Sequence, residues 1–231
     1  MRVVFCLPGR TFSDKFLKSW TNLLVSLTNR GIHFGVSQGY DPVVYYARNK
    51  CLGGDLMRGS KQKPWDEKVE YDYMMWIDSD MVFKYEHFSK LLDHDKDIVS
   101  GMYMMRDMKH FTTVKKWDED FFSKHGYFPF LKREDVIGEK KLMTVDYTGF
   151  GWMLVKCGVF ESMEYPWFRP EWKEFKFKGT NAELSTKPIE DTVVSEFTSE
   201  DVSWCHEVQK NGFDIHVDPT IIVGHEKNIV L

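Results

Sequence analysis

The chain has 231 residues, of which 42% are hydrophobic and 29% charged, and its formal net charge is −4 at pH 7. This size and composition predict a soluble protein with one main core. The balance of 31 Lys and Arg against 35 Asp and Glu argues against nucleic acid or an anionic membrane as a partner. No apolar run approaches the ~20 residues of a membrane span.

The N-terminal segment predicts a strand over residues 3–7 rather than a signal peptide, because its apolar run is short and stops at Pro8-Gly9. Apolar residues at helical spacing then predict a helix over residues 16–27, which Gly31 ends. The four cysteines are widely separated and match no zinc or disulfide spacing, so we expect reduced thiols and a cytoplasmic protein.

The rest of the first half alternates between strand and helix signals. We expect a strand at 32–36, a helix at 43–57, a strand at 73–77, a helix at 86–92 and a strand at 97–101. Such alternation predicts an α/β fold with a parallel sheet and helices on both faces.

Beyond residue 105 the pattern is less regular, and residues 106–140 match no pattern. The remaining signals predict strands at 142–147 and 151–155, a helix that Ser199 begins, and two short strands at 213–217 and 221–223.

The segment 165–172 combines several aromatic residues with two prolines, which excludes a regular helix or a central strand. It is either a packed connector or the wall of an acceptor site, where sugars would stack on aromatic rings.

The most informative motif closes the strand at 73–77, where Asp78 and Asp80 follow five bulky residues. Alternate residues of an extended chain point the same way, so the two carboxylates are expected to converge. They repel each other beside a core unless a cation neutralises them, and a hard divalent metal suits oxygen ligands. The same spacing at Asp93/Asp95, Asp95/Asp97 and Asp118/Asp120 lies in polar stretches and is typical of solvated charge.

Taken in order, these motifs resemble the GT-A fold glycosyltransferases, particularly the broad family-two neighbourhood with its viral and bacterial relatives. The resemblance spans nearly the whole chain and rests on Ala47-Arg48-Asn49, Trp76 to Asp80, Asp97 to Gly101, Thr148 to Gly151, Ser199-Glu200-Asp201 with Cys205, and Gly212 through Gly224-His225. It implies a single domain, residues 1–231, with a Rossmann-like, mostly parallel sheet. Residues 1–105 would bind the nucleotide-sugar, and residues 106–231 would bind the acceptor.

The resemblance implies a metal-dependent enzyme that moves a sugar from a UDP- or GDP-sugar to a hydroxyl of a glycan, protein or lipid-linked acceptor, with inversion. Mn²⁺ or Mg²⁺ would be held by Asp78, Asp80 and His225, with Asp80 the direct ligand and Asp78 on the ribose or a metal-bound water. Asp201, ahead of Glu200, would deprotonate the attacking hydroxyl.

The resemblance also implies a set of donor-binding positions. Pro8, Gly9 and Arg10 follow the first strand and would meet the nucleobase, because ligands of such sheets gather at the carboxyl ends of the strands. Arg48 would face the donor, and Ser79 belongs to the same motif as its flanking aspartates. The glycines at 149 and 151 would let the backbone approach the sugar closely.

Other interpretations remain open at this stage. Glu200 and Asp201 also suit plain helix capping, Arg48 a surface salt bridge and His225 a surface histidine. A retaining mechanism stays possible if neither acid is placed as a base. The rival functions are a sugar nucleotidyltransferase and a non-catalytic nucleotide-sugar-binding module. The first would need a glycine-rich loop with a lysine after the first strand, which Pro8-Gly9-Arg10-Thr11 matches poorly.

Overall fold

The computed structural model describes residues 1–177 and 190–227. Within these residues the main sheet has seven strands. Their order is β2 (His33–Gly39), β1 (Arg2–Pro8), β3 (Tyr73–Ile77), β10 (Trp152–Lys156), β5 (Ile98–Met102), β13 (Ile215–Ile222) and β8 (Met143–Val145). Strands from both halves of the chain therefore share one sheet.

The main sheet is mixed but mostly parallel. β1 runs parallel to β2 and β3, and β5 runs parallel to β13. β10 is antiparallel to both β3 and β5, so β5 and β3 point the same way, while β8 is antiparallel to β13. The fold-class prediction is confirmed, because the chain has the mixed α/β arrangement of a Rossmann-like GT-A fold.

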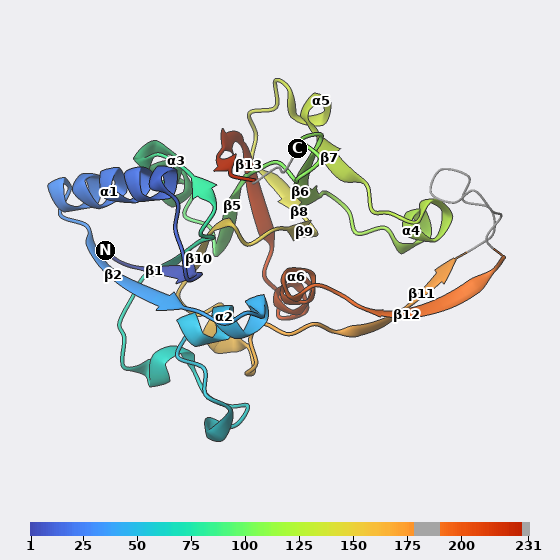
Figure 1. Cartoon of the computed structure of the whole chain (residues 1–231), viewed down its shortest axis with the longest axis horizontal. Helices are drawn as coiled ribbons and strands as arrows, with labels where there is room; N and C mark the ends of the chain where they lie inside the picture. Colours follow the sequence, from blue (N-terminus) through green and yellow to red (C-terminus); the bar gives the residue numbers. More distant parts are fainter. Residues whose placement is uncertain (178–189, 228–231) are drawn as a thin grey trace.

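Helices cover both faces of the sheet (Figure 1), and the strand sequences explain why. Val3, Phe5 and Leu7 point to one face, together with the buried residues of α1 (Asp14–Asn29) and α3 (Tyr85–Asp93). Val4 and Cys6 point to the other face, where α2 (Val44–Cys51) and α6 (Glu200–Lys210) pack. The two-residue alternation of an extended chain thus supplies both cores.

Smaller elements complete the second half. A three-stranded sheet is formed by β7 (Phe130–Lys132), β6 (His110–Val114) and β9 (Tyr147–Thr148), with the short helices α4 (Glu119–His125) and α5 (Arg133–Val136) nearby. The hairpin of β11 (Trp172–Phe177) and β12 (Thr192–Phe197) extends from the body beside α4 (Figure 1). A last pair joins β4 (Met81–Val82) to β14 (Gly224–His225). Short 3₁₀ turns lie at 56–58, 64–67 and 160–162.

The central position of β10 was not predicted. Strand and helix alternation predicted a mostly parallel sheet without saying which strand runs the other way, and β10 is antiparallel to both of its neighbours. Its first residue, Trp152, lies opposite Ile77, the last residue of β3. The chain therefore enters β10 at the carboxyl end of β3, and it can only run back down the sheet.

Several boundaries also differ from the prediction. The helix expected at 43–57 ends at Cys51, because Gly53 has φ +69° and a Cβ atom at Gly54 would lie 2.9 Å from the Asn49 carbonyl oxygen. The strand expected at 142–147 is divided between β8 and β9, which belong to different sheets. The strands expected at 213–217 and 221–223 form the single strand β13.

The middle of the aromatic segment 165–172 is packed against the core. Trp167 and Phe168 are buried, and the Asn49 side chain donates to the Phe168 carbonyl at 2.7 Å and accepts from the Phe168 amide at 3.2 Å. The packed-connector interpretation therefore holds at these two residues. Trp172, where β11 begins, is 61% exposed.

All four cysteines are free, with Cys157 exposed and the other three buried. Among the described helices, none combines the length and apolarity needed to cross a membrane.

Candidate functional site

The predicted donor-binding segments meet at the carboxyl ends of β1 and β3. A Cβ atom added at Gly9 would lie 2.8 Å from the Cβ atom of Ser79, so the two loops touch there. The Asp78 amide donates to the Gly151 carbonyl at 3.1 Å, which brings the start of β10 to the same place. Neighbouring parallel strands end at one edge of a sheet, which is why segments 70 residues apart come together.

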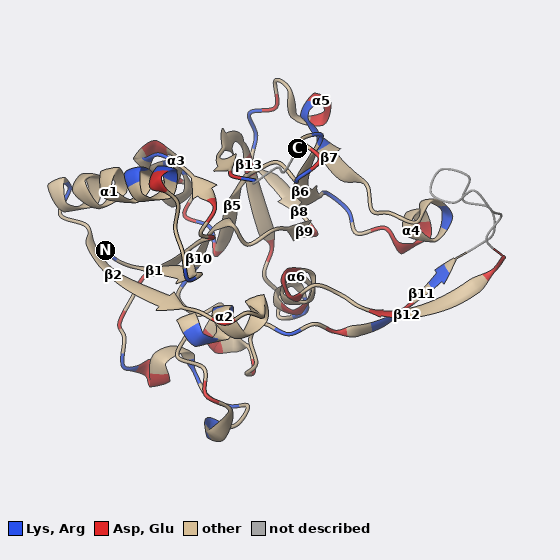
Figure 2. Cartoon of the chain, in the orientation of Figure 1, with Lys and Arg blue, Asp and Glu red and all other residues tan. Residues whose placement is uncertain are grey.

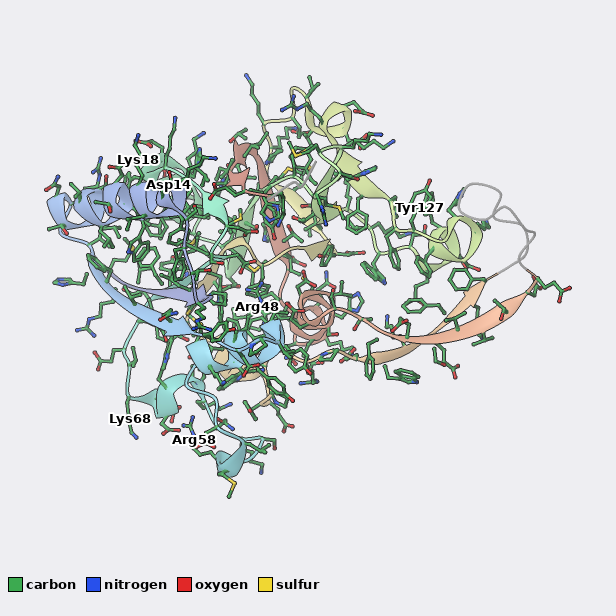
Figure 3. The ribbon with its side chains drawn as sticks, in the orientation of Figure 1. Asp14, Lys18, Arg48, Arg58, Lys68 and Tyr127 are labelled. Carbon is green, nitrogen blue, oxygen red and sulfur yellow. The ribbon has the colours of Figure 1, made fainter. Side chains whose placement is uncertain are left out.

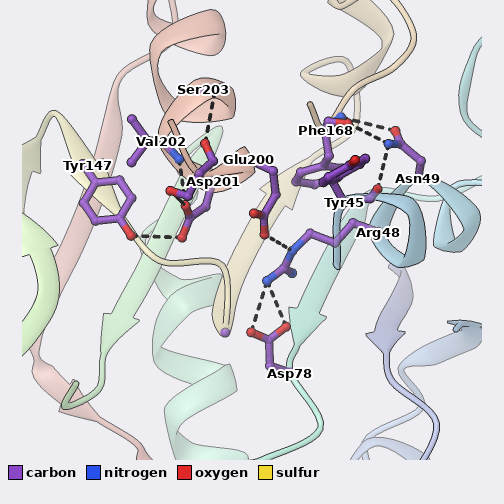
Figure 4. A network of polar contacts seen from close by, with 12 residues as sticks. Tyr45, Arg48, Asn49, Asp78, Tyr147, Phe168, Glu200, Asp201, Val202 and Ser203 are labelled. Atoms are coloured by element: carbon purple, nitrogen blue, oxygen red, sulfur yellow. Dashed lines mark hydrogen bonds and ion pairs between the residues drawn. The ribbon is translucent and has the colours of Figure 1, made fainter. Parts of the chain in front are cut away.

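Arg48 lies at the centre of a buried ion network (Figure 4). Its Nη2 atom lies 3.1 Å from both carboxylate oxygens of Asp78, and its Nε atom lies 3.3 Å from Glu200 Oε1. The Arg48 side chain is 4% exposed, so it is not the surface salt bridge considered above. One guanidinium thus joins the end of β3 to the first turn of α6.

The electrostatics of this network favour a charged Arg48. Burial alone would lower the pKa of its guanidinium, but the charges of Asp78 and Glu200 raise it above the ordinary value. Burial and the charge of Asp201 raise the pKa of the Glu200 carboxyl, against the opposing effect of Arg48. Arg48 Nη1 is buried and has no hydrogen-bond partner among the described residues.

Asp80 belongs to a second, more open group. Its Oδ2 atom lies 2.7 Å from Lys227 Nζ and 3.2 Å from His225 Nε2. Burial raises the pKa of the Asp80 carboxyl, but the hydrogen bonds from His225 and Lys227 outweigh it and lower the pKa to about 2. Asp80 is therefore a carboxylate at neutral pH.

His225 is oriented by the backbone. Its Nδ1 atom lies 2.7 Å from the Met104 carbonyl oxygen, which can only accept a hydrogen bond, so Nδ1 carries the hydrogen. The Nε2 atom faces Asp80: with a hydrogen it donates to that carboxylate, and without one it can bind a metal. Metal-binding histidines commonly donate their other ring nitrogen in this way. β14 places the residue, because His225 pairs with Met81 of β4.

A cavity of about 420 Å³ opens beside Asp80. It is lined by Thr11, Phe12, Ser13, Ser79, Asp80, Glu226 and Lys227. No group of three or more His, Cys, Asp or Glu side chains in residues 1–177 and 190–227 forms a complete metal cage. Asp80 and His225 fit a metal that takes its other ligands from a bound diphosphate and water, whereas Asp78 is turned to Arg48.

Glu200 and Asp201 differ sharply in their partners, although they are neighbours in α6. Asp201 accepts hydrogen bonds from the Tyr147 hydroxyl at 2.9 Å, from the Val202 amide at 2.9 Å and from the Ser199 hydroxyl. Among the described side chains, Glu200 has one partner, Arg48. The first turn of α6 therefore holds one carboxylate with three hydrogen-bond donors and one with a single side-chain partner.

Gly149 and Gly151 make room for Tyr103. A Cβ atom at Gly149 would lie 2.2 Å from the Tyr103 hydroxyl oxygen, and one at Gly151 would lie 2.8 Å from the Tyr103 ring. The Tyr103 hydroxyl accepts from the Gly151 amide at 2.9 Å, and its ring meets the His225 ring edge-on at 5.0 Å. Packing against Tyr103 accounts for both glycines, and the close approach of this backbone to a sugar stays a prediction.

The remaining predicted residues, Pro8, Gly9 and Arg10, lie at the end of β1 and directly after it. Pro8 is the last residue of β1, and the Gly9 amide donates to the Gly39 carbonyl at 2.9 Å. Arg10 is exposed, and its guanidinium lies 5.6 Å from the centre of the Tyr40 ring.

Sequence reasoning missed three residues that contact this site: Tyr103, Tyr147 and Lys227. Tyr103 follows β5 directly, so its position at the carboxyl edge of the sheet was a usable signal. Tyr147 and Lys227 carried none, because their contacts with Asp201 and Asp80 span 54 and 147 residues of sequence.

No protein-family model and no curated protein sequence matches the chain. Among solved structures, the chain is similar to A197 from STIV, with a TM-score of 0.55 and 15% identity over 99% of this chain and 87% of that one. GalNAc-T7, solved with UDP, GalNAc and Mn²⁺, has a TM-score of 0.49 and 9% identity over 99% of this chain and 44% of its own. The inositol-1-phosphate CTP transferase from T. maritima has a TM-score of 0.42 and 9% identity over 98% of this chain and 89% of its own. At 15% identity, the likeness to A197 concerns the fold.

Proposed function

We propose that the protein is a metal-dependent glycosyltransferase that uses a UDP- or GDP-sugar as donor and a hydroxyl group as acceptor. The observation that carries the proposal is the pairing of Asp80 with His225 Nε2 at 3.2 Å, at the carboxyl edge of the sheet and beside a cavity of about 420 Å³. Ligands of open α/β sheets bind at this edge.

The donor set suits Mn²⁺ slightly better than Mg²⁺, because it combines a carboxylate with an imidazole. When bound, such an ion supplies Lewis-acid stabilisation of the departing diphosphate. The Met104 carbonyl keeps His225 in the tautomer that such binding needs. Lys227 lies 2.7 Å from the same Asp80 oxygen, so its ammonium group has to move aside for a metal and is then close enough to meet a phosphate.

For the general base, the contacts shift the proposal from Asp201 toward Glu200. Three donors already occupy acceptor sites on Asp201, two of them on Oδ1 and one on Oδ2. Glu200 has a raised pKa and spare acceptor capacity, which brings it closer to the operating pH of a base. Attack by a hydroxyl that Glu200 deprotonates, in line with the departing diphosphate, inverts the anomeric centre.

Arg48 is proposed to hold this arrangement together. It fixes the Asp78 carboxylate, which leaves Asp80 and His225 to the metal, and it fixes the Glu200 carboxylate at the start of α6. Its buried Nη1 atom is a donor without a protein partner in the described residues, so a ligand oxygen that reached it would be bound strongly.

The test is release of nucleoside diphosphate from a panel of UDP- and GDP-sugars with Mn²⁺, for the wild type and Asp80→Asn. We expect one nucleotide class to be consumed by the wild type and at least a hundredfold less by Asp80→Asn. The matched control is Asp93→Asn, which alters an exposed aspartate with the same Asp-x-Asp spacing. Release of pyrophosphate when a nucleoside triphosphate and a sugar 1-phosphate replace the nucleotide-sugar would identify a nucleotidyltransferase. Equal rates in all three proteins would refute the proposal.

A further inference from the structure

The largest cavity near the site lies in the second half of the chain. Its volume is about 1270 Å³, against about 420 Å³ for the cavity beside Asp80. Its lining lies between residues 105 and 144, mostly within residues 106–140, which match no sequence pattern, and includes residues of β6, α4, β7 and α5. Figure 3 labels one lining residue, Tyr127, beside α4. The volume exceeds the ~300–1,000 Å³ of most small-molecule pockets, so it admits a ligand of more than one sugar ring.

Aromatic rings form one wall of this second-half cavity. Phe121, Phe128 and Phe130 all line it. Phe128 is held firmly, because it stacks on Trp117 with ring centroids 3.6 Å apart and on Phe122 at 4.5 Å. Phe128 is itself buried, so the open ring surface of this wall comes from the partly exposed Phe121 and Phe130. Such rings offer flat apolar surfaces at low entropic cost.

The charged residues of the cavity balance each other. Lys115, Lys116 and Lys132 are opposed by four acidic residues, Asp107, Asp118, Glu134 and Asp135. Figure 2 shows both signs of charge on α4 and α5. Such a lining neither attracts a polyanion nor matches a cationic ligand. Flat rings with interspersed donors and acceptors suit an uncharged ligand that carries many hydroxyl groups.

The cavity adjoins the proposed chemistry at two points. Phe130 meets the ring of Tyr147 edge-on at 6.1 Å, and the Tyr147 hydroxyl donates to Asp201. On the other side, the lining residue Met105 follows Met104, whose carbonyl orients His225. Two residues of the cavity wall are therefore direct neighbours of residues that support the site.

We infer that the second-half cavity binds the acceptor, and that the acceptor is a neutral oligosaccharide. The inference rests on the proposed function, because it assigns the acceptor of that same reaction. Sugar rings place their C–H faces on Phe121 and Phe130, and their hydroxyl groups bond to the lysine and carboxylate side chains at the rim.

The experiment is saturation-transfer NMR on the donor-free protein with maltohexaose, cellohexaose, mannohexaose and chitohexaose, and with hyaluronan and heparin hexasaccharides as charged probes. We expect at least one neutral hexasaccharide to receive saturation. Phe121→Leu and Phe130→Leu, which keep an apolar side chain but lose the ring, should weaken its binding by about threefold to tenfold. Trp172→Leu, an exposed aromatic outside the cavity, is the control and should bind as the wild type does.

Circular dichroism and thermal unfolding of each variant check that the fold is intact. Binding of the charged probes alone, binding of none of the neutral ones, or equal binding in both phenylalanine variants overturns the inference. Mn²⁺ and UDP binding is measured on the same samples. If it persists while no oligosaccharide binds the cavity, the acceptor inference fails and the donor site stands. If oligosaccharide binds the cavity but Mn²⁺ and UDP do not bind, the cavity is a carbohydrate site and the proposed transferase fails.

Discussion

The two acidic groups at the tip of β3 are two residues apart in sequence and similarly exposed, at 29% for Asp78 and 38% for Asp80, but their partners differ. Asp78 is tied to Arg48, whose side chain is 4% exposed, within a network that also holds Glu200. Asp80 faces Lys227 and His225, and the side chains of Asp80 and Lys227 are 38% and 31% exposed. A buried ion pair resists exchange because a separated charge is costly there, whereas an exposed pair is easily replaced. The difference suggests a fixed scaffold beside an exchangeable cation site.

The largest predicted effect is on the rate of sugar transfer, at the proposed base Glu200. Glu200→Gln keeps the size of the side chain but removes its ability to accept a proton, so we expect transfer to slow by on the order of 10²–10⁴-fold. Asp201→Asn should slow it less, because that carboxylate is already occupied by three donors. Single-turnover rates with saturating donor measure the effect. A larger loss of rate in Asp201→Asn would favour Asp201 over Glu200 as the base, as the resemblance implies.

The next effect is on stability, at Arg48. Arg48→Met removes the only cation between two carboxylates in the described network, and we expect a loss of ~3–5 kcal/mol in the free energy of unfolding. Lys50→Met is the control, because it breaks an exposed ion pair with Asp41 and should cost less than ~1 kcal/mol. Urea denaturation compares them. A cost below ~1 kcal/mol for Arg48→Met would contradict the scaffold role.

Tyr103 contacts neighbours of both aspartates. Its hydroxyl accepts from the amide of Gly151, whose carbonyl accepts from the Asp78 amide, and its ring meets the ring of His225, which pairs with Asp80. Gly149→Ala should cost ~1–3 kcal/mol, because the new methyl group would meet the Tyr103 hydroxyl oxygen at 2.2 Å. Removing that oxygen in Tyr103→Phe should restore part of the loss. A double-mutant cycle of unfolding free energies measures the coupling. Strictly additive effects would show that Gly149 matters for another reason.

The smallest predicted effect is on ligand affinity at Asp80, where Lys227→Ala should change the affinities for Mn²⁺ and for UDP in opposite directions. Lys227→Ala removes the ammonium that competes for Asp80, so the affinity for Mn²⁺ alone should rise about twofold to fivefold. The affinity for UDP in the presence of Mn²⁺ should fall, because a cation near the phosphates is lost. Calorimetric titrations supply both values. Lys15→Ala is the control, since Lys15 pairs with the adjacent Glu226 rather than with Asp80. Two changes of the same sign in Lys227→Ala would exclude this role.

The sequence was informative wherever the pattern was local. Strand β3 and helix α1 lie where the apolar run and the helical spacing of apolar residues placed them. The order of elements then put the ends of β1 and β3 together, because parallel neighbours end at one edge. The resemblance added Arg48 and His225, which no local pattern distinguished from ordinary surface residues.

What the sequence could not supply were contacts over long sequence separations. Nothing local in β10 says that it runs antiparallel between β3 and β5, since that depends on where the chain enters the sheet. The carboxylates of Asp78 and Asp80 were expected to converge, but Asp78 forms an ion pair with Arg48 of α2. The glycines at 149 and 151 stood out in the sequence, but their steric partner Tyr103 lies almost 50 residues away.

The central claim is that Asp80 and His225 hold a divalent metal against a nucleoside diphosphate. The most direct measurement is an electron paramagnetic resonance titration of Mn²⁺ in the presence of UDP or GDP, with wild type, Asp80→Asn and His225→Gln. The account predicts a nucleotide-dependent bound Mn²⁺ signal in the wild type, weakened at least tenfold in each variant. A wild type that binds no Mn²⁺ with either nucleotide, or variants that bind it as tightly as the wild type, would contradict the claim.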